Sequence, residues 1–365
     1  MNPLKRLWQE QRQAVWLDFI ERDLLTGGGL ARYVEDDGVR GVTSNPSIFQ
    51  KAIEGGGPYD EAVADLLAAD PEMTTIQLYE ALAIEDIQHA ADILHSVWAE
   101  SQAGDGYVSL EVSPHLARDT AGTVAEAKRL WQRVGRPNLM IKVPATPEGI
   151  PAIEELIGDG INVNATLMFS LADYEAVATA YLRGLEVNSN PVGVASVASF
   201  FVSRVDTKVD AALEAIGTLE ALALCGRAAI ANAKLAYRRF GELFGATAFA
   251  PLAARGAMVQ RPLWASTSTK NPDYRDVIYV EELIGPDTVN TLPVATLEAF
   301  RDHGEPRTSL LEDVNGADRV FAELAEVGVD IDATTTQLQV EGVAAFAKSF
   351  DQLLGALDEA RAGRK

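Results

Sequence analysis

The chain has 365 residues, of which 47% are hydrophobic, so it can bury a large core and is not expected to be disordered as a whole. Its 31 Lys and Arg residues against 53 Asp and Glu residues give a formal net charge of −22. Such an acidic surface repels the phosphates of nucleic acids, and a nucleic-acid partner is therefore not expected. An anionic ligand would need a local cluster of basic side chains and backbone donors.

The single cysteine and the N-terminal sequence both favour a cytoplasmic location. Cys225 is the only cysteine, so the chain can form no internal disulfide and encodes no cysteine-based metal cluster. The first residues, MNPLKRLWQEQRQ, are charged and amphipathic, without the apolar segment of a signal peptide. No run approaches the roughly 20 apolar residues of a membrane span. We therefore expect a soluble, cytoplasmic protein without a membrane partner.

Short runs of strand-forming residues alternate along the chain with longer stretches in which apolar residues recur at helical spacing, such as SLADYEAVATAYLRGLE. Eight such strands with intervening helices favour a closed α/β barrel, the (β/α)8 TIM barrel, over an open doubly wound sheet. Additional helices are expected at the N- and C-terminal ends. No linker or repeat divides the sequence, so we expect a single domain over residues 1–365. The predicted strands are 14–20, 38–45, 106–113, 139–146, 161–169, 193–202, 257–266 and 276–282.

Polar side chains lie near the ends of seven of these eight strands, where barrel enzymes carry their active sites. The carboxyl ends of parallel strands meet at one rim, so these side chains are expected to converge. That convergence is stronger evidence for a site than any one of its members. In chain order the residues are Asp18, Thr43, Asn45, Ser109, Glu111, Lys142, Asn164, Thr166, Ser199 and Ser266.

Lys142 is the most unusual of these residues, because the surrounding NLMIKVPAT otherwise has the composition of a strand buried on both faces. A lysine there loses much of its hydration, which favours the neutral amine that can attack a carbonyl. The resulting Schiff base withdraws electrons, so a neighbouring carbon–carbon bond can break if other groups handle the protons. Asp18 and Glu111 supply suitable carboxylates from two different strands.

The same residues allow other interpretations. Lys142 could pair with a carboxylate in a polar layer inside the barrel, and Asp18 could cap a helix after the first strand. Asn45-Pro46 is also a common start of a turn. His89 and His95 face different sides of one predicted helix, so they do not indicate a metal site.

The motifs WLDFI, GVTSNPSIF, VSLEVSP, MIKVPAT, INVNATLMFS, ASFFVSRVD and PLWASTSTKNP resemble, in this order, those of the transaldolases in their longer bacterial form. The resemblance extends over nearly the whole chain. It implies a class I aldolase mechanism on a (β/α)8 barrel, with the Schiff-base lysine on the fourth strand and with no cofactor or metal. Lys142 lies on the fourth strand predicted independently of this resemblance.

The resemblance also implies a role for each matching position. Lys142 would attack the C2 carbonyl of a ketose phosphate, and Glu111 would assist loss of water from the carbinolamine through a water molecule. Asp18 would take the proton of the C4 hydroxyl as the C3–C4 bond breaks. Asn45 and Asn164 would hold the hydroxyls of the attached dihydroxyacetone unit. Further positions in or next to the family's substrate site are Thr43, Ser109, Thr166, Ser199 and Phe201.

Arg204 would bind the substrate phosphate, for which a guanidinium fork is well suited. The alternative is that Arg204 pairs with Asp206 or Asp210 on the surface. Shorter transaldolases carry a second phosphate-binding arginine after the seventh strand, where this chain reads WASTSTKNP. Ser266 and Lys270 are the candidates there, and a lysine would bind phosphate as a point charge without the fork.

The implied reaction moves a dihydroxyacetone unit from sedoheptulose 7-phosphate or fructose 6-phosphate to glyceraldehyde 3-phosphate or erythrose 4-phosphate, in the non-oxidative pentose phosphate pathway. One alternative is a fructose 6-phosphate aldolase that releases free dihydroxyacetone, although those relatives are much shorter chains. Another is a sugar-phosphate-binding barrel without catalysis. The expected partners are small sugar phosphates, and the chain could act as a monomer or a homodimer.

Overall fold

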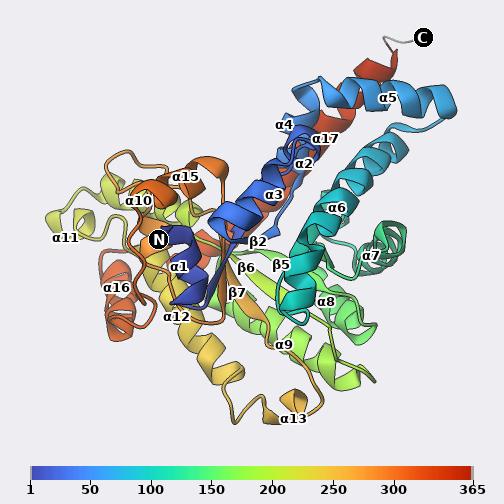
Figure 1. Ribbon diagram of the computed structural model, residues 1–365. Coiled ribbons are helices and arrows are strands. Elements are labelled where there is room, and N and C mark those ends of the chain that lie inside the picture. The colour runs from blue at the N-terminus through green and yellow to red at the C-terminus, as the bar shows by residue number, and fades with distance from the viewer. Residues whose placement is uncertain (1, 363–365) are drawn as a thin grey trace.

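The computed structural model describes residues 2–362, in which the strands form one closed parallel barrel with helices around it (Figure 1). Each strand pairs with the next in the sequence, and the last strand pairs with the first. The predicted (β/α)8 barrel is therefore confirmed. Its strands are Gln13–Leu17 (β1), Val39–Val42 (β2), Tyr107–Glu111 (β3), Leu139–Pro144 (β4), Val163–Met168 (β5), Ser196–Phe201 (β6), Arg261–Ala265 (β7) and Thr288–Leu292 (β8).

Helices follow the strands and form the outer layer, and short helical turns occupy several of the connections. Those before β4 are Pro3–Gln9 (α1), Arg22–Thr26 (α2), Gly29–Arg32 (α3), Tyr33–Asp37 (η1), Pro46–Glu54 (α4), Pro58–Ala69 (α5), Thr75–Glu100 (α6), Pro114–Leu116 (η2) and Thr120–Val134 (α7). Those after β4 are Gly149–Gly158 (α8), Leu171–Val187 (α9), Ser203–Ile216 (α10), Leu219–Leu222 (α11), Ala228–Leu243 (α12), Ala250–Ala253 (α13), Ile278–Glu281 (α14), Val294–His303 (α15), Val314–Glu326 (α16) and Ile331–Ala362 (α17).

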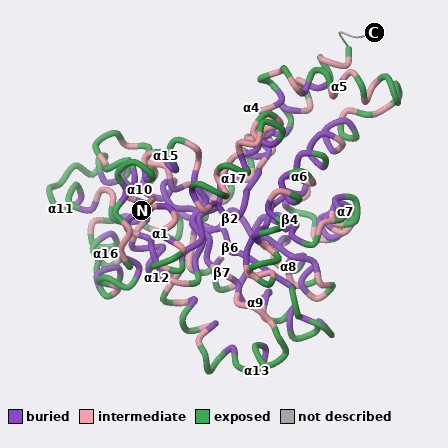
Figure 2. Tube along the Cα trace, viewed as in Figure 1, coloured by how far each residue is buried: buried purple, intermediate pink, exposed green. Residues whose placement is uncertain are grey.

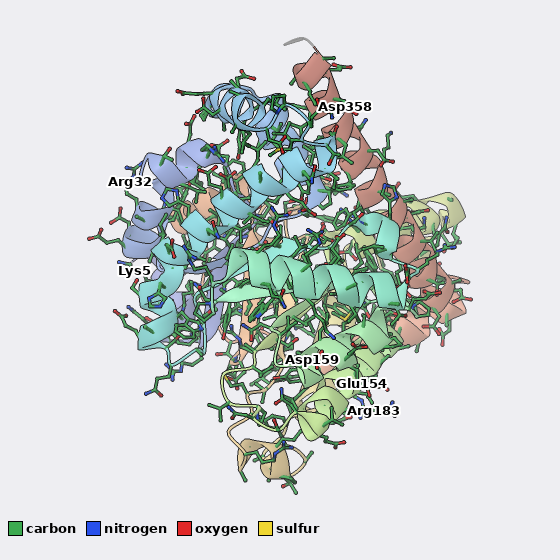
Figure 3. All side chains as sticks on the ribbon, turned by 90° about the vertical axis from the view of Figure 1, so that its right-hand side faces the viewer. Lys5, Arg32, Glu154, Asp159, Arg183 and Asp358 are labelled. Atoms are coloured by element: carbon green, nitrogen blue, oxygen red, sulfur yellow. The ribbon has the colours of Figure 1, made fainter. Side chains whose placement is uncertain are left out.

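The core follows the strands, where buried residues are concentrated, whereas exposed residues lie on the outer sides of the helices (Figure 2). Charged side chains such as Glu154, Asp159 and Arg183 project from this outer layer (Figure 3). None of the helices within residues 2–362 combines the length and hydrophobicity that a membrane span requires.

The predicted strand at 276–282 is wrong. α14 occupies most of that range, and the barrel is closed by β8, further along the chain. Val277, Tyr279 and Val280 are buried, which explains why the segment has the composition of a strand although it forms a helical turn. The other seven predicted strands overlap β1 to β7, with extra residues at one or both ends.

β8 was missed because three of its five residues are polar, so it contains no apolar run. These side chains are nevertheless buried, because each finds a hydrogen-bond partner inside the barrel. Gln13 donates to Thr288 at 2.9 Å, and Thr267 donates to Asn290 at 2.9 Å.

The expected helices at the two ends are present as α1 and α17. α17 runs beside α4 from the barrel towards the C-terminal end (Figure 1). Its Gln339 donates to the carbonyl oxygens of Ala145 and Leu167, at 2.9 and 3.3 Å. Ala145 directly follows β4 and Leu167 lies near the end of β5, so α17 lies against the carboxyl ends of the strands.

Candidate active site

A cavity of about 260 Å³ opens at the carboxyl ends of the strands. Nine of the side chains predicted for the site line it: Asp18, Thr43, Asn45, Lys142, Ser199, Phe201, Arg204, Ser266 and Lys270. The other lining residues were not singled out from the sequence, and they are Ser47, Ile48, Lys51, Ala265, Ser268, Thr291, Pro293 and Phe346.

Lys142 is only 5% exposed, and its neighbours come from three parts of the chain. Its Nζ donates to the carbonyl oxygen of Ser44 at 3.2 Å and lies 5.9 Å from the ring centroid of Phe346. The register of β3 and β4 places Glu111 directly opposite, with 3.7 Å between Nζ and Oε2. Lys142 therefore does pair with a carboxylate, and that carboxylate is one of the two predicted to move protons.

Glu111 is 9% exposed and is held next to a cation without a short hydrogen bond to it. The 3.7 Å separation is an ion-pair distance, and Oε2 has no hydrogen-bond partner among the described residues. Burial raises the pKa of Glu111 to about 7, although the positive charge of Lys142 opposes this shift. A carboxyl with such a pKa can both donate and accept a proton near neutral pH.

Asp18 follows β1 and accepts a hydrogen bond of 2.6 Å from the hydroxyl of Thr43. Thr43 also shares a hydrogen bond of 2.7 Å with Thr291; because its own proton goes to Asp18, Thr291 is the donor. Burial raises the pKa of Asp18, against the opposing charge of Lys142. The interpretation of Asp18 as a helix cap is wrong, since α2 has Glu21 at its N-cap.

Three buried polar side chains on β3, β5 and β6 form a hydrogen-bonded row beside Lys142. Ser199 donates to Oδ1 of Asn164 at 2.6 Å, and Nδ2 of Asn164 donates to Ser109 at 3.0 Å. The register of β4 and β5 places Asn164 opposite Lys142. The row fixes the orientation of the Asn164 amide, because each end of that amide has its own hydroxyl partner.

Four predicted site residues do not line the cavity. Ser109 and Asn164 belong to the buried row, and Glu111 is connected to the cavity through Lys142. Thr166 is buried on β5, and its hydroxyl has no hydrogen-bond partner in the described part of the chain. The structure therefore brings Thr166 near the site without giving it a contact there.

Asn45 begins a helix and also lines the cavity. Its Oδ1 accepts from the backbone N–H of Ile48 at 3.0 Å and caps α4, whose first residue is Pro46. The same side chain lines the cavity. The helix cap fixes the orientation of the amide at the cavity wall.

Arg204 lies in the first turn of α10, with its guanidinium 5.2 Å from the ring centroid of Phe201. The alternative of a surface pair with Asp206 or Asp210 is wrong. Asp206 accepts from Tyr279 at 2.7 Å and Asp210 from Tyr274 at 2.8 Å, while Arg204 forms no ion pair within residues 2–362.

The segment after β7 carries the two remaining candidates for a phosphate contact. Ser266 has φ of 56°, a left-handed conformation uncommon for a serine, and its hydroxyl lies 3.0 Å from that of Ser203. Lys270 donates to Ser268 at 2.7 Å. Burial and the nearby charge of Arg204 lower the pKa of Lys270. This end of the cavity is therefore positively charged in a strongly acidic protein.

Three lining residues that the sequence analysis missed differ in how they could have been found. Thr291 belongs to β8, the strand that was not predicted. Lys51 lies on α4, for which the sequence analysis predicted no helix, so its position relative to the cavity could not be derived from the residues around it. Phe346 carries no local signal, because nothing in the sequence shows that α17 reaches the barrel rim.

Across residues 2–362, no group of three or more His, Cys, Asp or Glu side chains is placed to hold a metal ion.

A family model described as Transaldolase/Fructose-6-phosphate aldolase matches residues 15–357 of this chain. The chain belongs to this family. The resemblance drawn from the sequence motifs is therefore confirmed, and it covers all eight strands of the barrel except the first two residues of β1.

Several bacterial members of the transaldolase family are similar over nearly their whole length. A protein of Thiobacillus denitrificans named Transaldolase is 52% identical over 346 residues, which cover 94% of this chain and 96% of that protein. One of Frankia alni with the same name is 50% identical over 361 residues, covering 98% and 96%. Transaldolase 1 of Streptomyces coelicolor is 48% identical over 361 residues, covering 97% and 93%.

Proposed function

We propose that this chain is a transaldolase that transfers a dihydroxyacetone unit through a Schiff base on Lys142. The observation on which this rests is a buried lysine 3.7 Å from a buried carboxylate, at a cavity that Asp18 and Arg204 also line. The extensive similarity to proteins named Transaldolase supports the same reaction.

The first half of the reaction joins Lys142 to the substrate. The neutral Nζ attacks the C2 carbonyl of a ketose phosphate, and the carbonyl oxygen becomes the hydroxyl of a carbinolamine. Glu111, acting through a water molecule, protonates that hydroxyl so that it leaves as water, and the nitrogen becomes part of an iminium ion. The pKa of about 7 for Glu111 suits this exchange, because both of its protonation states are available at neutral pH.

The second half breaks and remakes a carbon–carbon bond. Asp18 takes the proton of the C4 hydroxyl, the C3–C4 bond breaks, and its electron pair moves to the iminium to give an enamine. The aldose phosphate departs, and an acceptor aldehyde then reacts with the enamine by the reverse of these steps. The hydrogen bond from Thr43 orients the Asp18 carboxylate for this role.

The remaining residues bind and orient the substrate in this proposal. Asn45 and Asn164 hold the hydroxyls of the attached unit, and the latter is oriented by Ser109 and Ser199. Phe201 packs beside the phosphate end, under the guanidinium of Arg204. The phosphate contacts that we assign come from Arg204, Ser266 and Lys270, while Thr166 acts only as a neighbour of the site.

We assign sedoheptulose 7-phosphate and fructose 6-phosphate as donors, and glyceraldehyde 3-phosphate and erythrose 4-phosphate as acceptors, as in the pentose phosphate pathway. These sugar phosphates are cytoplasmic metabolites, so the proposal includes a cytoplasmic location. The alternative activity, release of free dihydroxyacetone by a fructose 6-phosphate aldolase, is less favoured because the relatives that match nearly end to end are named Transaldolase.

Borohydride trapping with fructose 6-phosphate, followed by peptide mass spectrometry, tests this proposal. We expect a reduced three-carbon adduct on the peptide that contains Lys142, and no adduct in Lys142→Ala. Asp18→Ala should accumulate a six-carbon adduct instead, because cleavage of the C3–C4 bond stalls. An adduct on another lysine would contradict the assignment, and rapid release of dihydroxyacetone without an acceptor would favour the aldolase.

A further inference from the structure

Lys51 lines the catalytic cavity, although the proposed mechanism gives it no role. It lies on α4, on the same face as Ser47 and Ile48, which precede it by four and three positions and also line the cavity. Within the described residues, no carboxylate lies within ion-pair distance of its amine. Lys51 therefore adds a fourth basic side chain to the three predicted from the sequence, Lys142, Arg204 and Lys270.

The three cations reach the cavity from different sides of the barrel. Arg204 follows β6 and Lys270 follows β7, whereas Lys51 lies on the helix after β2, on the other side of the closed strand order. Lys51 is nevertheless close enough to Lys270 that its charge, with that of Arg204, contributes to lowering the pKa of Lys270. The cavity mouth is thus positively charged on two sides.

Assembling like charges in this way has an energetic cost that an anion would offset. The cavity contains one lining carboxylate, Asp18, against the four cationic side chains Lys51, Lys142, Arg204 and Lys270. The whole chain, by contrast, carries a net charge of −22. A phosphate monoester carries close to two negative charges at neutral pH and offers several acceptor oxygens to such a cluster.

α4 is held in place, so its lysine is presented from a fixed element. Asn45 caps its first turn, and Ser47 forms a hydrogen bond of 2.8 Å with Ser349 on α17. Gln50 adds a contact of 3.3 Å to Gln352, one turn further along each helix. The lysine side chain itself remains free to reach into the cavity, and it is exposed in this structure.

We propose that Lys51 is a third cationic residue of the phosphate site, which contacts the substrate phosphate from the side opposite Arg204 and Lys270. This inference rests on the proposed function, since it concerns the phosphate end of the same substrates. Lys51 also adds a cation to a cavity that lacks the second arginine of shorter transaldolases, although it comes from the helix after β2 and not from the segment after β7.

Binding of inorganic phosphate, measured by calorimetry on the intact protein, tests the inference without requiring catalysis. Removing one charge-assisted contact in Lys51→Gln should weaken phosphate binding roughly tenfold, and Lys51→Arg should restore much of it. The matched control is Lys5→Gln, which makes the same charge change on α1, ahead of β1 at the other end of the barrel. Equal phosphate affinities for Lys51→Gln and Lys5→Gln would overturn the inference.

Kinetics and trapping separate this inference from the proposed function. In Lys51→Gln the KM for fructose 6-phosphate should rise roughly tenfold, with a much smaller change in kcat. Borohydride trapping with dihydroxyacetone, which has no phosphate, should be affected far less than the reaction of fructose 6-phosphate. Equal losses with both substrates would contradict a phosphate role, whereas absence of any adduct in the unmodified protein would contradict the proposed function instead.

Discussion

Glu111 and Lys142 are two buried ionisable side chains that face each other from neighbouring strands. Burial is the largest effect on the pKa of Glu111, and it disfavours the ionised carboxylate. The lysine partly reverses that effect, and the pKa of Glu111 settles at about 7. Burial beside a lysine thus gives Glu111 a pKa suited to proton transfer.

This shift predicts a pH-dependent stability that Glu111→Gln should remove. Between the ordinary pKa of 4.5 and the folded value of about 7, the native state holds the proton more tightly than the unfolded chain does. The free energy of unfolding therefore falls as the pH rises through this window. We expect the protein to lose up to about 3 kcal/mol relative to Glu111→Gln between pH 4.5 and pH 7.5.

Urea unfolding of both proteins at these two pH values measures the difference. Glu100→Gln, at the exposed end of α6, makes the same chemical change on the surface and serves as the control. If the protein and Glu111→Gln showed parallel pH dependence, burial would not raise the pKa of Glu111 in the folded protein.

At the scale of the elements, the sequence predicted seven strands because most of them are rich in buried apolar residues and have a polar residue near the end. β4 is typical, since all six of its residues are buried and Lys142 stands out among them. β8 could not be found in this way, because Thr288, Asn290 and Thr291 are stabilised by partners from distant segments. Local patterns do not reveal such partners.

In the candidate site, too, some residues can be recognised from local sequence and others only from the folded structure. Lys142, Glu111 and Asp18 are recognisable because an ionisable residue at the end of a strand is unusual in itself. Phe346 is an ordinary core residue by sequence, and only its position on α17 gives it a place beside Lys142. Tertiary packing of a helix far along the chain is therefore the part that sequence reasoning could not supply.

Phe346→Ala tests whether α17 shields the covalent intermediate. The ring is 4% exposed and covers the Lys142 amine. Its loss should lower the free energy of unfolding by about 3 kcal/mol and should also let water reach the amine. We expect release of free dihydroxyacetone from fructose 6-phosphate, without an acceptor, to increase several-fold. Phe346→Leu should retain most of the shielding, and unchanged release in Phe346→Ala would exclude this role for α17.

At the scale of the whole molecule, the opposite end of the barrel is closed by a second buried charge cluster. Asp105 precedes β3 and is fully buried. It accepts from Nε1 of Trp16 at 2.8 Å and from Nε of Arg40 at 2.9 Å, and Arg261 approaches it at 3.3 Å. These residues belong to β1, β2 and β7, so one carboxylate connects strands around the barrel.

Asp105→Ala should therefore separate stability from activity. It leaves two guanidinium groups and an indole N–H without their shared acceptor, which should lower the free energy of unfolding by about 3 kcal/mol or more. The cavity at the carboxyl ends contains none of these residues, so the trapped adduct on Lys142 should still form at temperatures where the variant is folded. Urea unfolding measures the stability of the variant, and borohydride trapping on the same preparation measures adduct formation. Lys142→Ala is the control that should lose the adduct. A stable Asp105→Ala protein that fails to form the adduct would show that the two ends of the barrel are coupled.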